Sequence, residues 1–200
     1  MPSSTLSQDP LKFAFLDRDG IINKNAPNGG YVLRPKQFHL VDGVIDFLSA
    51  LSQMNYQLIV ITNQQGIGRG LMTEQDLDDV HAVMHRLLNE GGISIEGTYH
   101  CPHLASTDCD CRKPKPGLFI RAAQEHTINL NQAIFIGDSL TDAEAGKAAR
   151  VRTFLIDSPR LHDKTLQGKS TLLAKDRTDG AEVTIVEGFE QLKNLLESDQ

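Results

Sequence analysis

The sequence has little of three things: excess positive charge, cysteine and long apolar runs. Its 20 Lys and Arg residues are outnumbered by 26 Asp and Glu residues, so the formal net charge is −6, whereas a nucleic-acid-binding protein normally presents a basic face. Three cysteines are too few for a disulfide scaffold and suit a reducing cytoplasm. No apolar run approaches the length of a membrane span. We therefore expect a cytoplasmic protein with neither a nucleic-acid nor a membrane partner.

The rest of the composition is that of an ordinary globular protein. The chain has 200 residues, of which 40% are hydrophobic and 23% charged, and this suits one domain with a sizeable core. The first ten residues, MPSSTLSQDP, are polar and lack the apolar segment of a secretory signal. We expect a flexible N-terminal tail over 1–10 and a single domain over 11–200, acting as a monomer.

Short apolar segments alternate with amphipathic ones along the chain. The apolar segments predict strands at residues 12–16, 58–62, 97–99, 133–136, 153–156 and 183–186. The amphipathic segments predict helices at residues 44–54, 74–89, 117–125, 142–149 and 189–197. This alternation predicts an α/β fold with a doubly wound, Rossmann-like parallel sheet. The polar stretch 158–181 has weak periodicity and is interpreted as a long loop or flexible insertion.

Polar and charged residues stand where the predicted strands end. Asp17 and Asp19 follow the first strand in FAFLDRDG, Thr-Asn-Gln (62–64) follows the second, and GDSLTD (137–142) follows the fourth. Ligands of an open α/β sheet bind beyond the carboxyl ends of its strands, so these groups should share one crevice. Carboxylates would suit Mg²⁺, and the basic pair in CRKPKPG (111–117) implies a substrate with negative charge of its own.

Each of these residues also has a plain structural interpretation. An Asp after a strand is often a helix cap or a turn former, and Asp138 or Asp142 could cap the following helix. Thr62 could be an ordinary β-branched strand residue, and RKPKP a solvated basic turn. Taken together, these structural interpretations are less convincing, because every one of these motifs falls at a strand end or a helix start, in one consistent order along the chain.

In that order, FLDRDG, VITNQ, RKPKPG and IGDSLTD resemble the four motifs of the haloacid-dehalogenase superfamily of aspartate-nucleophile phosphatases. The resemblance covers roughly residues 12–157. It implies that Asp17 is the nucleophile, that Asp19 is the general acid and base, and that Thr62 and Lys113 hold the phosphoryl oxygens. It also implies a catalytic Mg²⁺ held by the Asp17 carboxylate, the Asp19 backbone carbonyl and Asp138.

All three cysteines lie in CPHLASTDCDC (101–111), within a predicted zinc loop at 100–112. The segment offers four zinc-compatible ligands, which would fill a tetrahedral site and make the zinc structural: Cys101, His103, Cys109 and Cys111. The alternative is three incidental buried thiols. His100 is a rival ligand, but the family pattern puts the ligand after Cys-Pro, at His103.

The zinc loop narrows the resemblance to a small, cap-poor branch that contains histidinol-phosphate phosphatases and heptose-1,7-bisphosphate 7-phosphatases. GGYV, FHLVDGV and TNQQGIGRG are similar to stretches of the heptose enzymes, whose product feeds nucleotide-activated heptose synthesis for lipopolysaccharide or other surface glycans. The implied substrate is a small phosphorylated sugar. The residues implied to touch it are Asn28, Gly30, Tyr31, Thr62, Asn63, Gln64, Gln65, Arg112, Lys113 and Ser139.

Two departures from that branch stand out. Ile21 takes the place of a usual Thr, and the stretch NKNAPNGGYV is a few residues longer than usual. A histidinol-phosphate phosphatase is the alternative enzyme, and a zinc-stabilised binding module without catalysis is the alternative of another class. The complete set of carboxylates and the lysine argue against the binding module. Arg112 is the candidate for a second substrate phosphate, since a guanidinium forms bidentate pairs with phosphate.

Overall fold

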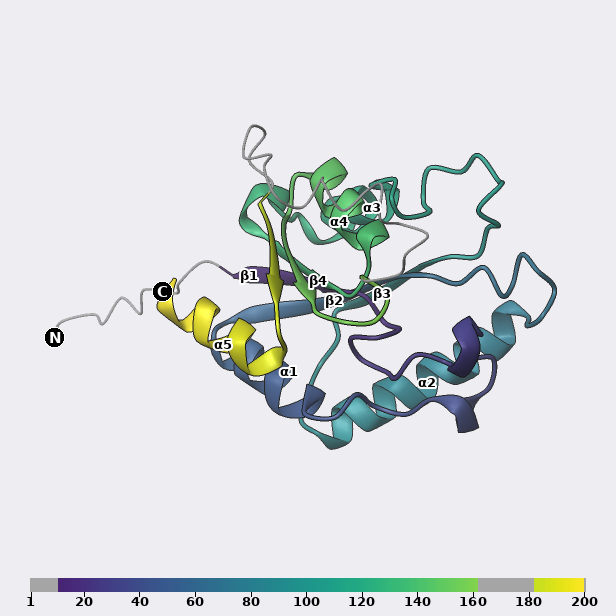
Figure 1. The fold of residues 1–200 in the computed structure, drawn as a ribbon, viewed down its shortest axis with the longest axis horizontal. Helices are drawn as coiled ribbons and strands as arrows, with labels where there is room; N and C mark the ends of the chain where they lie inside the picture. The colour runs from purple at the N-terminus through teal and green to yellow at the C-terminus, as the bar shows by residue number, and fades with distance from the viewer. Residues whose placement is uncertain (1–10, 162–181, 200) are drawn as a thin grey trace, which may run out of the picture.

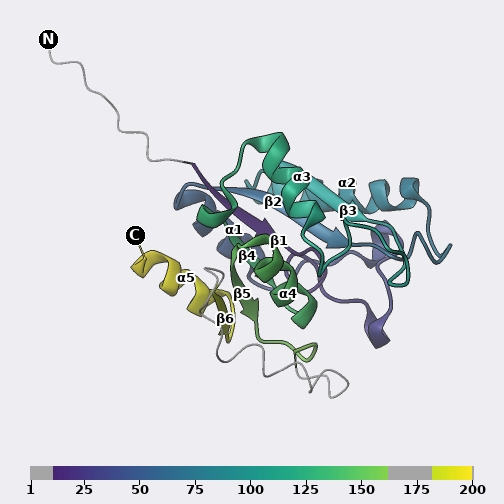
Figure 2. The ribbon, with the colours of Figure 1, turned by 90° about the horizontal axis from the view of Figure 1, so that it is seen from above.

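Six parallel strands form one sheet in the order β3-β2-β1-β4-β5-β6, in a computed structural model that describes residues 11–161 and 182–199. Figures 1 and 2 show the sheet, with β3 and β6 at its opposite edges. The strands are β1 (Lys12–Leu16), β2 (Tyr56–Asn63), β3 (Gly97–Cys101), β4 (Ile134–Gly137), β5 (Arg152–Ile156) and β6 (Val183–Val186). This order confirms the predicted doubly wound sheet. The predicted tail at 1–10 and residues 162–181 of the predicted loop lie outside the described residues.

Helices cover both faces of the sheet. On one face lie α1 (Val44–Gln53), α2 (Glu74–Glu90) and α5 (Phe189–Ser198), and on the other lie α3 (Gly117–His126) and α4 (Leu140–Ala149) (Figure 1). Strand side chains alternate between the faces. Ala14 and Leu16 therefore join the core under α1 and α2, whereas Phe15 joins the core under α3.

The smaller of the two cores is built on aromatic contacts. The Phe119 ring packs edge-on against Phe15 and Phe135, with centroids 5.1 and 5.0 Å apart. All three side chains are fully buried, and burial of one such side chain stabilises a fold by about 1.5–3 kcal/mol. This packing anchors α3, and α3 follows directly on the predicted basic motif at 111–117.

Element boundaries differ from the predicted ones by a few residues, and two differences matter for function. Helix α4 begins at Leu140, two residues before its predicted start, because the Ser139 side chain accepts a hydrogen bond from the Asp142 amide. Ser139 is thus the cap, in place of Asp138 or Asp142. Strand β3 runs two residues further than predicted, since His100 and Cys101 still pair with β2, and this carries the first cysteine to the end of the sheet.

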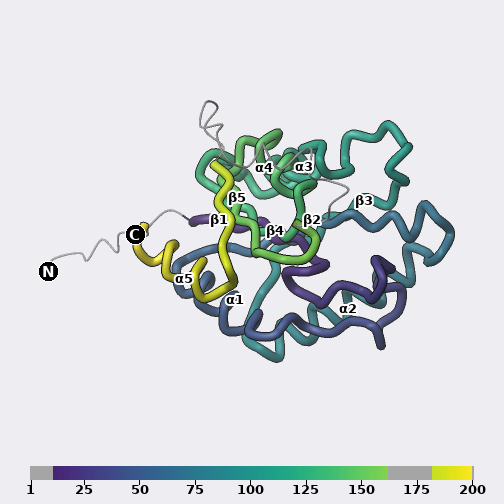
Figure 3. Tube along the Cα trace, viewed as in Figure 1, coloured from purple at the N-terminus to yellow at the C-terminus, as the bar shows by residue number. Residues whose placement is uncertain are grey.

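The connection between β1 and α1 contains two short 3₁₀ turns, at Pro27–Gly29 and Pro35–Gln37. It runs along α2 (Figure 3), and Arg34 forms an ion pair of 3.1 Å with Asp76 there. Asp76 also forms a capping box with Thr73 at the start of α2. Between β1 and α1 the structure has only these two turns and no longer helix or strand, which agrees with the predicted cap-poor architecture. Within residues 11–161 and 182–199, no helix is both long enough and apolar enough to cross a membrane.

Candidate active site

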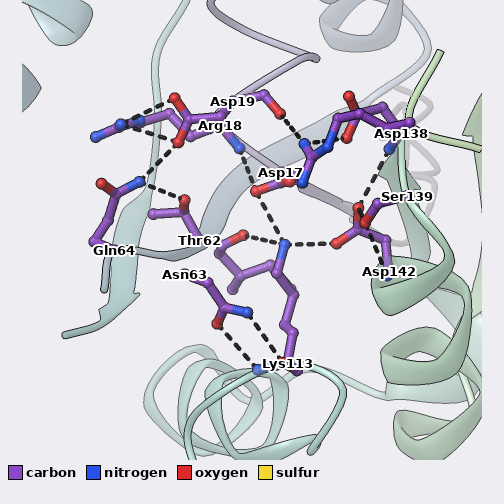
Figure 4. A network of polar contacts seen from close by, with 12 residues as sticks. Asp17, Arg18, Asp19, Thr62, Asn63, Gln64, Lys113, Asp138, Ser139 and Asp142 are labelled. Atoms are coloured by element: carbon purple, nitrogen blue, oxygen red, sulfur yellow. Dashed lines mark hydrogen bonds and ion pairs between the residues drawn. The ribbon is translucent and has the colours of Figure 1, made fainter. Parts of the chain in front are cut away.

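The carboxyl ends of β1, β2 and β4 meet at one edge of the sheet, as predicted. They bring Asp17, Thr62 and Asp138 together, and the loop before α3 adds Lys113 (Figure 4). β1 stands between the other two strands because it pairs with β2 on one side and β4 on the other. Asp17 therefore occupies the centre of this edge, and the other groups surround it.

Asp17 is almost completely buried, with 5% exposure. Its backbone amide donates to the Ile136 carbonyl at 2.9 Å, and its Oδ1 accepts from the Arg18 amide at 2.8 Å. Burial raises the pKa of Asp17, Lys113 opposes it and the neighbouring carboxylates Asp142 and Asp138 add to it, so that the pKa is about 7. The balance between its protonated and anionic forms therefore depends on nearby positive charge.

Lys113 supplies that positive charge. Its Nζ lies 2.9 Å from Asp17 Oδ1 and 2.7 Å from Asp142 Oδ1, and it donates to the Ile61 carbonyl at 3.2 Å. Although burial opposes the charged form, Asp142 and Asp17 together raise the pKa of Lys113, so it stays an ammonium. Asn63 fixes its backbone through two hydrogen bonds of 3.0 Å, one to the amide and one to the carbonyl. Figure 4 shows the ammonium among these contacts.

Asp19 belongs to a separate hydrogen-bond network beside Asp17. It accepts from Arg18 Nη2 at 3.0 Å with both oxygens, from Asn23 at 2.9 Å and from Gln64 at 2.8 Å. Burial alone would raise the pKa of Asp19, but the Arg18 guanidinium and these hydrogen bonds outweigh it and lower the pKa. Gln64 also donates to the Thr62 hydroxyl at 2.9 Å. Asp19 is thus held ionised in a fixed orientation.

Arg18 and His81 support Asp19 and were not predicted. Arg18 has no exposed surface, and its Nη1 lies 3.3 Å from His81 Nε2. Burial, followed by the positive Arg18, lowers the pKa of His81 to about 3, so the ring is neutral and accepts the hydrogen bond. The only sign in the sequence is an arginine between two acids, and an arginine there is usually exposed.

Asp138 is 1% exposed, and both of its carboxylate oxygens are engaged. Oδ2 accepts from Asn25 Nδ2 at 3.1 Å, and Oδ1 pairs with Arg160 Nη1 at 2.7 Å. The turn after Asp19 needs a glycine, because Gly20 has φ +98° and a Cβ there would lie 2.0 Å from Asp138 Oδ2. Arg160 falls in the stretch predicted only as a loop, so it is a further residue of the site that was not predicted from the sequence.

Oxygen ligands for a cation converge beside Asp17. One oxygen each from Asp17, Asp138 and Asp142 lie within 4.8 Å of one another, although Asp142 is engaged by Lys113 and by the Ser139 hydroxyl at 2.5 Å. The Asp19 backbone carbonyl and Asp138 already share one cationic partner, Arg160 Nη1, at 3.1 and 2.7 Å. Hard oxygen atoms arranged around a positive charge fit Mg²⁺, so Asp17, Asp138 and the Asp19 carbonyl could hold it.

These groups open into a cavity of about 380 Å³. Nine of the ten residues predicted to touch substrate line it, namely Gly30, Tyr31, Thr62, Asn63, Gln64, Gln65, Arg112, Lys113 and Ser139. Asn28 is the exception: the 3₁₀ turn at Pro27–Gly29 gives it φ 56° and leaves it exposed, and Gly29 lines the cavity in its place. Asn25 and Arg160 line the cavity without having been predicted.

The four predicted zinc ligands converge next to the cavity. His103 Nδ1 lies 3.4 Å from Cys101 Sγ and 3.2 Å from Cys111 Sγ, and Cys109 Sγ lies 3.7 Å from Cys101 Sγ. Ligands bound to one tetrahedral zinc stand about 3.3–3.8 Å apart, given bond lengths of about 2.0–2.3 Å, and separations of 3.2–3.7 Å are close to that spacing, so the cluster could hold zinc. The rival His100 is turned away, with Nε2 2.9 Å from Glu74.

The cysteine-rich loop also forms part of the cavity wall. Arg112 Nη1 donates to the His103 carbonyl at 3.2 Å. On the other side of the cavity, the backbone N–H of Gln64 donates to the Cys101 carbonyl at 2.7 Å, and the backbone N–H of Gly68 donates to the Pro102 carbonyl at 3.0 Å. The loop therefore connects the two walls that carry Arg112 and Gln64.

Comparison with known proteins agrees with this geometry. A family model described as haloacid dehalogenase-like hydrolase matches residues 9–150. The chain is 38% identical over 151 residues to the D-glycero-β-D-manno-heptose-1,7-bisphosphate 7-phosphatase of Pasteurella multocida, covering 72% of this chain and 80% of that protein. It is 40% identical over 146 residues to the Helicobacter pylori protein of that name, covering 72% of this chain and 83% of the other.

A solved structure is similar over nearly the whole chain. It is the D,D-heptose 1,7-bisphosphate phosphatase of B. bronchiseptica, complexed with magnesium and phosphate, with a TM-score of 0.78 and 28% identity. The match covers 95% of this chain and 100% of that one. The chain therefore belongs to the haloacid dehalogenase-like hydrolases and, as its motifs predicted, is a phosphatase related to the heptose bisphosphate phosphatases of that family.

Proposed function

We propose that the protein removes the 7-phosphate from D-glycero-β-D-manno-heptose 1,7-bisphosphate in a Mg²⁺-dependent reaction. The observation that carries the proposal is the buried Asp17 carboxyl, paired with Lys113 at the base of a cavity whose wall carries Arg112. A carboxylate nucleophile placed among cations is suited to an anionic phosphate. The names and identities of the relatives favour the heptose bisphosphate over histidinol phosphate.

The reaction has two displacements. A carboxylate oxygen of Asp17 attacks phosphorus as the bond to the sugar oxygen breaks, and Asp19 gives a proton to the departing oxygen. Asp19 then takes a proton from water, which attacks the aspartyl phosphate and releases phosphate. Lys113 and Thr62 hold the phosphoryl oxygens throughout, where most of the catalysis of phosphoryl transfer arises.

Two pKa shifts of the ligand-free site fit these roles. In the first displacement Asp19 has to carry a proton, and the negative charge of a bound phosphate raises the pKa of Asp19 and favours that protonated form. In the second displacement Asp19 acts as a base, for which it has to be ionised, as it is in the ligand-free site. Asp17, with a pKa raised by burial to about 7, needs further positive charge to be fully anionic at neutral pH. When bound by Asp17, Asp138 and the Asp19 carbonyl, Mg²⁺ would supply that charge and neutralise the phosphate.

We further propose that Cys101, His103, Cys109 and Cys111 hold a structural zinc. Four protein ligands leave no open position for water, so the metal would organise the loop that carries Arg112 and Lys113. Three free thiols suit a reducing compartment, and we retain the cytoplasm as the proposed location.

Phosphate release tests the proposed substrate. The β-anomer of the heptose bisphosphate, the α-anomer and histidinol phosphate should be compared at equal concentrations with magnesium. We expect the β-anomer to have the highest kcat/KM, and Asp17→Asn serves as the inactive control. A wild-type preference for histidinol phosphate would overturn the substrate assignment while leaving the phosphatase assignment intact.

Arg112 gives a second test of the same assignment. It lines the cavity and stands on the side of Lys113 nearer the cysteine cluster, where a second phosphate could meet it. Arg112→Ala should lower kcat/KM for the bisphosphate by at least about tenfold, equivalent to roughly 1.4 kcal/mol. Its effect on histidinol phosphate should be much smaller, because that substrate offers a cationic amine at its far end. An equal loss on both substrates would contradict this role.

A further inference from the structure

Arg160 connects the loop after β5 to the centre of the active site. Its Nη1 lies 2.7 Å from Asp138 Oδ1, donates to the Asp19 carbonyl at 3.1 Å and reaches Asn25 Oδ1 at 3.4 Å. Two hydrogen bonds define the turn that carries it: Ser158 Oγ donates to the Asp138 carbonyl at 2.9 Å and ties the turn to the end of β4, and the Leu161 amide donates to the Ser158 carbonyl at 3.0 Å and closes the turn. Arg160 is thus placed in the site by a defined turn.

The two oxygens that Arg160 contacts are two of the oxygens that could hold Mg²⁺. One nitrogen atom reaches both of them, so the guanidinium takes the position of a cation shared by Asp138 and Asp19. A divalent cation at those oxygens would repel the guanidinium, because two positive charges a few ångströms apart in a buried site are strongly unfavourable. Arg160 contact and metal binding should therefore exclude each other.

Displacement would leave the guanidinium in the cavity. The Arg160 side chain is 45% exposed, whereas Asp138 is 1% exposed, so the arginine has room to turn and the aspartate does not. Arg160 lines the cavity that Arg112 also lines. An unpaired guanidinium there is a ready partner for a phosphate group, with which it forms charge-assisted hydrogen bonds.

We propose that Arg160 is a further substrate-binding residue that competes with Mg²⁺ for Asp138 and the Asp19 carbonyl, and that metal binding frees its guanidinium to bind the phosphate of the substrate. This inference rests on the proposed phosphatase function. It links two binding events: the metal both completes the site and releases the group that holds the anion.

Calorimetric titration tests the competition directly. MgCl₂ is titrated into zinc-containing protein prepared without magnesium, as wild type and as Arg160→Gln. The variant should bind Mg²⁺ at least about fivefold more tightly, corresponding to the loss of a competing ion pair of about 1 kcal/mol. Inorganic phosphate is then titrated into the magnesium-saturated proteins, and the variant should bind it at least about fivefold more weakly, by the same reasoning.

Arg112→Gln is the matched control for the metal titration. It removes the same charge from the same cavity, but Arg112 contacts the His103 carbonyl and not the magnesium ligands. Its Mg²⁺ affinity should stay close to that of wild type. Unchanged or weaker Mg²⁺ binding by Arg160→Gln, or equal tightening in both variants, would overturn the competition. Unchanged phosphate binding would overturn the second role. Neither titration depends on which phosphorylated compound is hydrolysed, so a failed heptose assay would leave the result standing.

Discussion

Lys113 is the buried cation on which the carboxylates of the site depend, and its replacement by methionine tests that dependence. Its Nζ lies 2.9 Å from Asp17 and 2.7 Å from Asp142, and all three side chains are at most 7% exposed. Removing one partner of a buried ion pair typically costs about 3–5 kcal/mol, because an uncompensated charge remains. Lys113→Met should therefore lower the free energy of unfolding, measured by urea denaturation near pH 8.5, by about that amount.

The loss should shrink as the pH falls. Burial already raises the pKa of Asp17 to about 7, and removal of Lys113 raises it further. Burial also favours a raised pKa for Asp142, and Lys113 is the largest factor that lowers it. A carboxyl whose folded pKa lies above its unfolded pKa destabilises the fold as the pH rises between the two values. Near pH 5 Asp17 of the variant should be protonated, and Asp142 should be protonated to a greater extent than near pH 8.5, so the difference from wild type should be smaller there.

A double-mutant cycle with Asp142→Asn is the control. Lys113→Met should cost less in the Asp142→Asn background than in wild type, with a coupling of at least about 1 kcal/mol. If Lys113→Met lowers the free energy of unfolding by less than about 1 kcal/mol, the range of exposed ion pairs, or by an amount that does not change with pH, the carboxylates do not depend on Lys113 in this way.

Three further expectations follow from the site. Asp17→Asn should abolish turnover, since an amide cannot form an acyl phosphate, and Asp19→Asn should slow phosphate release by about 10²–10⁴-fold and let phospho-enzyme accumulate, as mass spectrometry would show. About one zinc per chain should copurify by elemental analysis, and Cys109→Ala or Cys111→Ala should lower Tm and phosphate affinity together. Unfolded His81 takes up a proton near pH 6.5 but folded His81 only near 3, so wild type should lose up to about 1.4 kcal/mol of stability per pH unit between these values as the pH falls. Urea denaturation at several pH values should show a smaller slope for His81→Gln. The first expectation is contradicted by near-normal turnover in Asp17→Asn, and the second by zinc-free protein prepared without chelators. The third is contradicted if wild type and His81→Gln lose stability equally steeply as the pH falls.

The convergence of Asp17, Thr62 and Asp138 could be predicted because it follows from the topology of a parallel sheet. Any residue directly after a strand arrives at the same edge, whatever its neighbours do. The cysteine cluster could be predicted for a related reason, since four ligands within eleven residues leave few ways to arrange themselves around one metal. These are properties of spacing and connectivity, which a sequence states directly.

The residues that escaped prediction act through tertiary contacts. The buried Arg18 donates to His81, 63 positions away, and nothing local marks that partner. Arg160 stands in a polar stretch with weak periodicity, and a turn closed by Ser158 brings it to Asp138. Asn28 was predicted to touch substrate, but it stands in the 3₁₀ turn at Pro27–Gly29 and does not line the cavity; its contact with substrate stays a prediction.

The central position of β1 has a consequence for how this enzyme can change. β1 is hydrogen-bonded to β2 on one side and β4 on the other, and the Asp17 amide donates to Ile136 at 2.9 Å. That amide should exchange its hydrogen with solvent only when the whole sheet opens, whereas the loops that carry Arg112 and Arg160 lie outside the ladder and open at lower cost. Those loops can lengthen, shorten or be exchanged without breaking a strand pairing. Selection can therefore redirect the enzyme to another phosphorylated compound through its loops while the nucleophile stays in place.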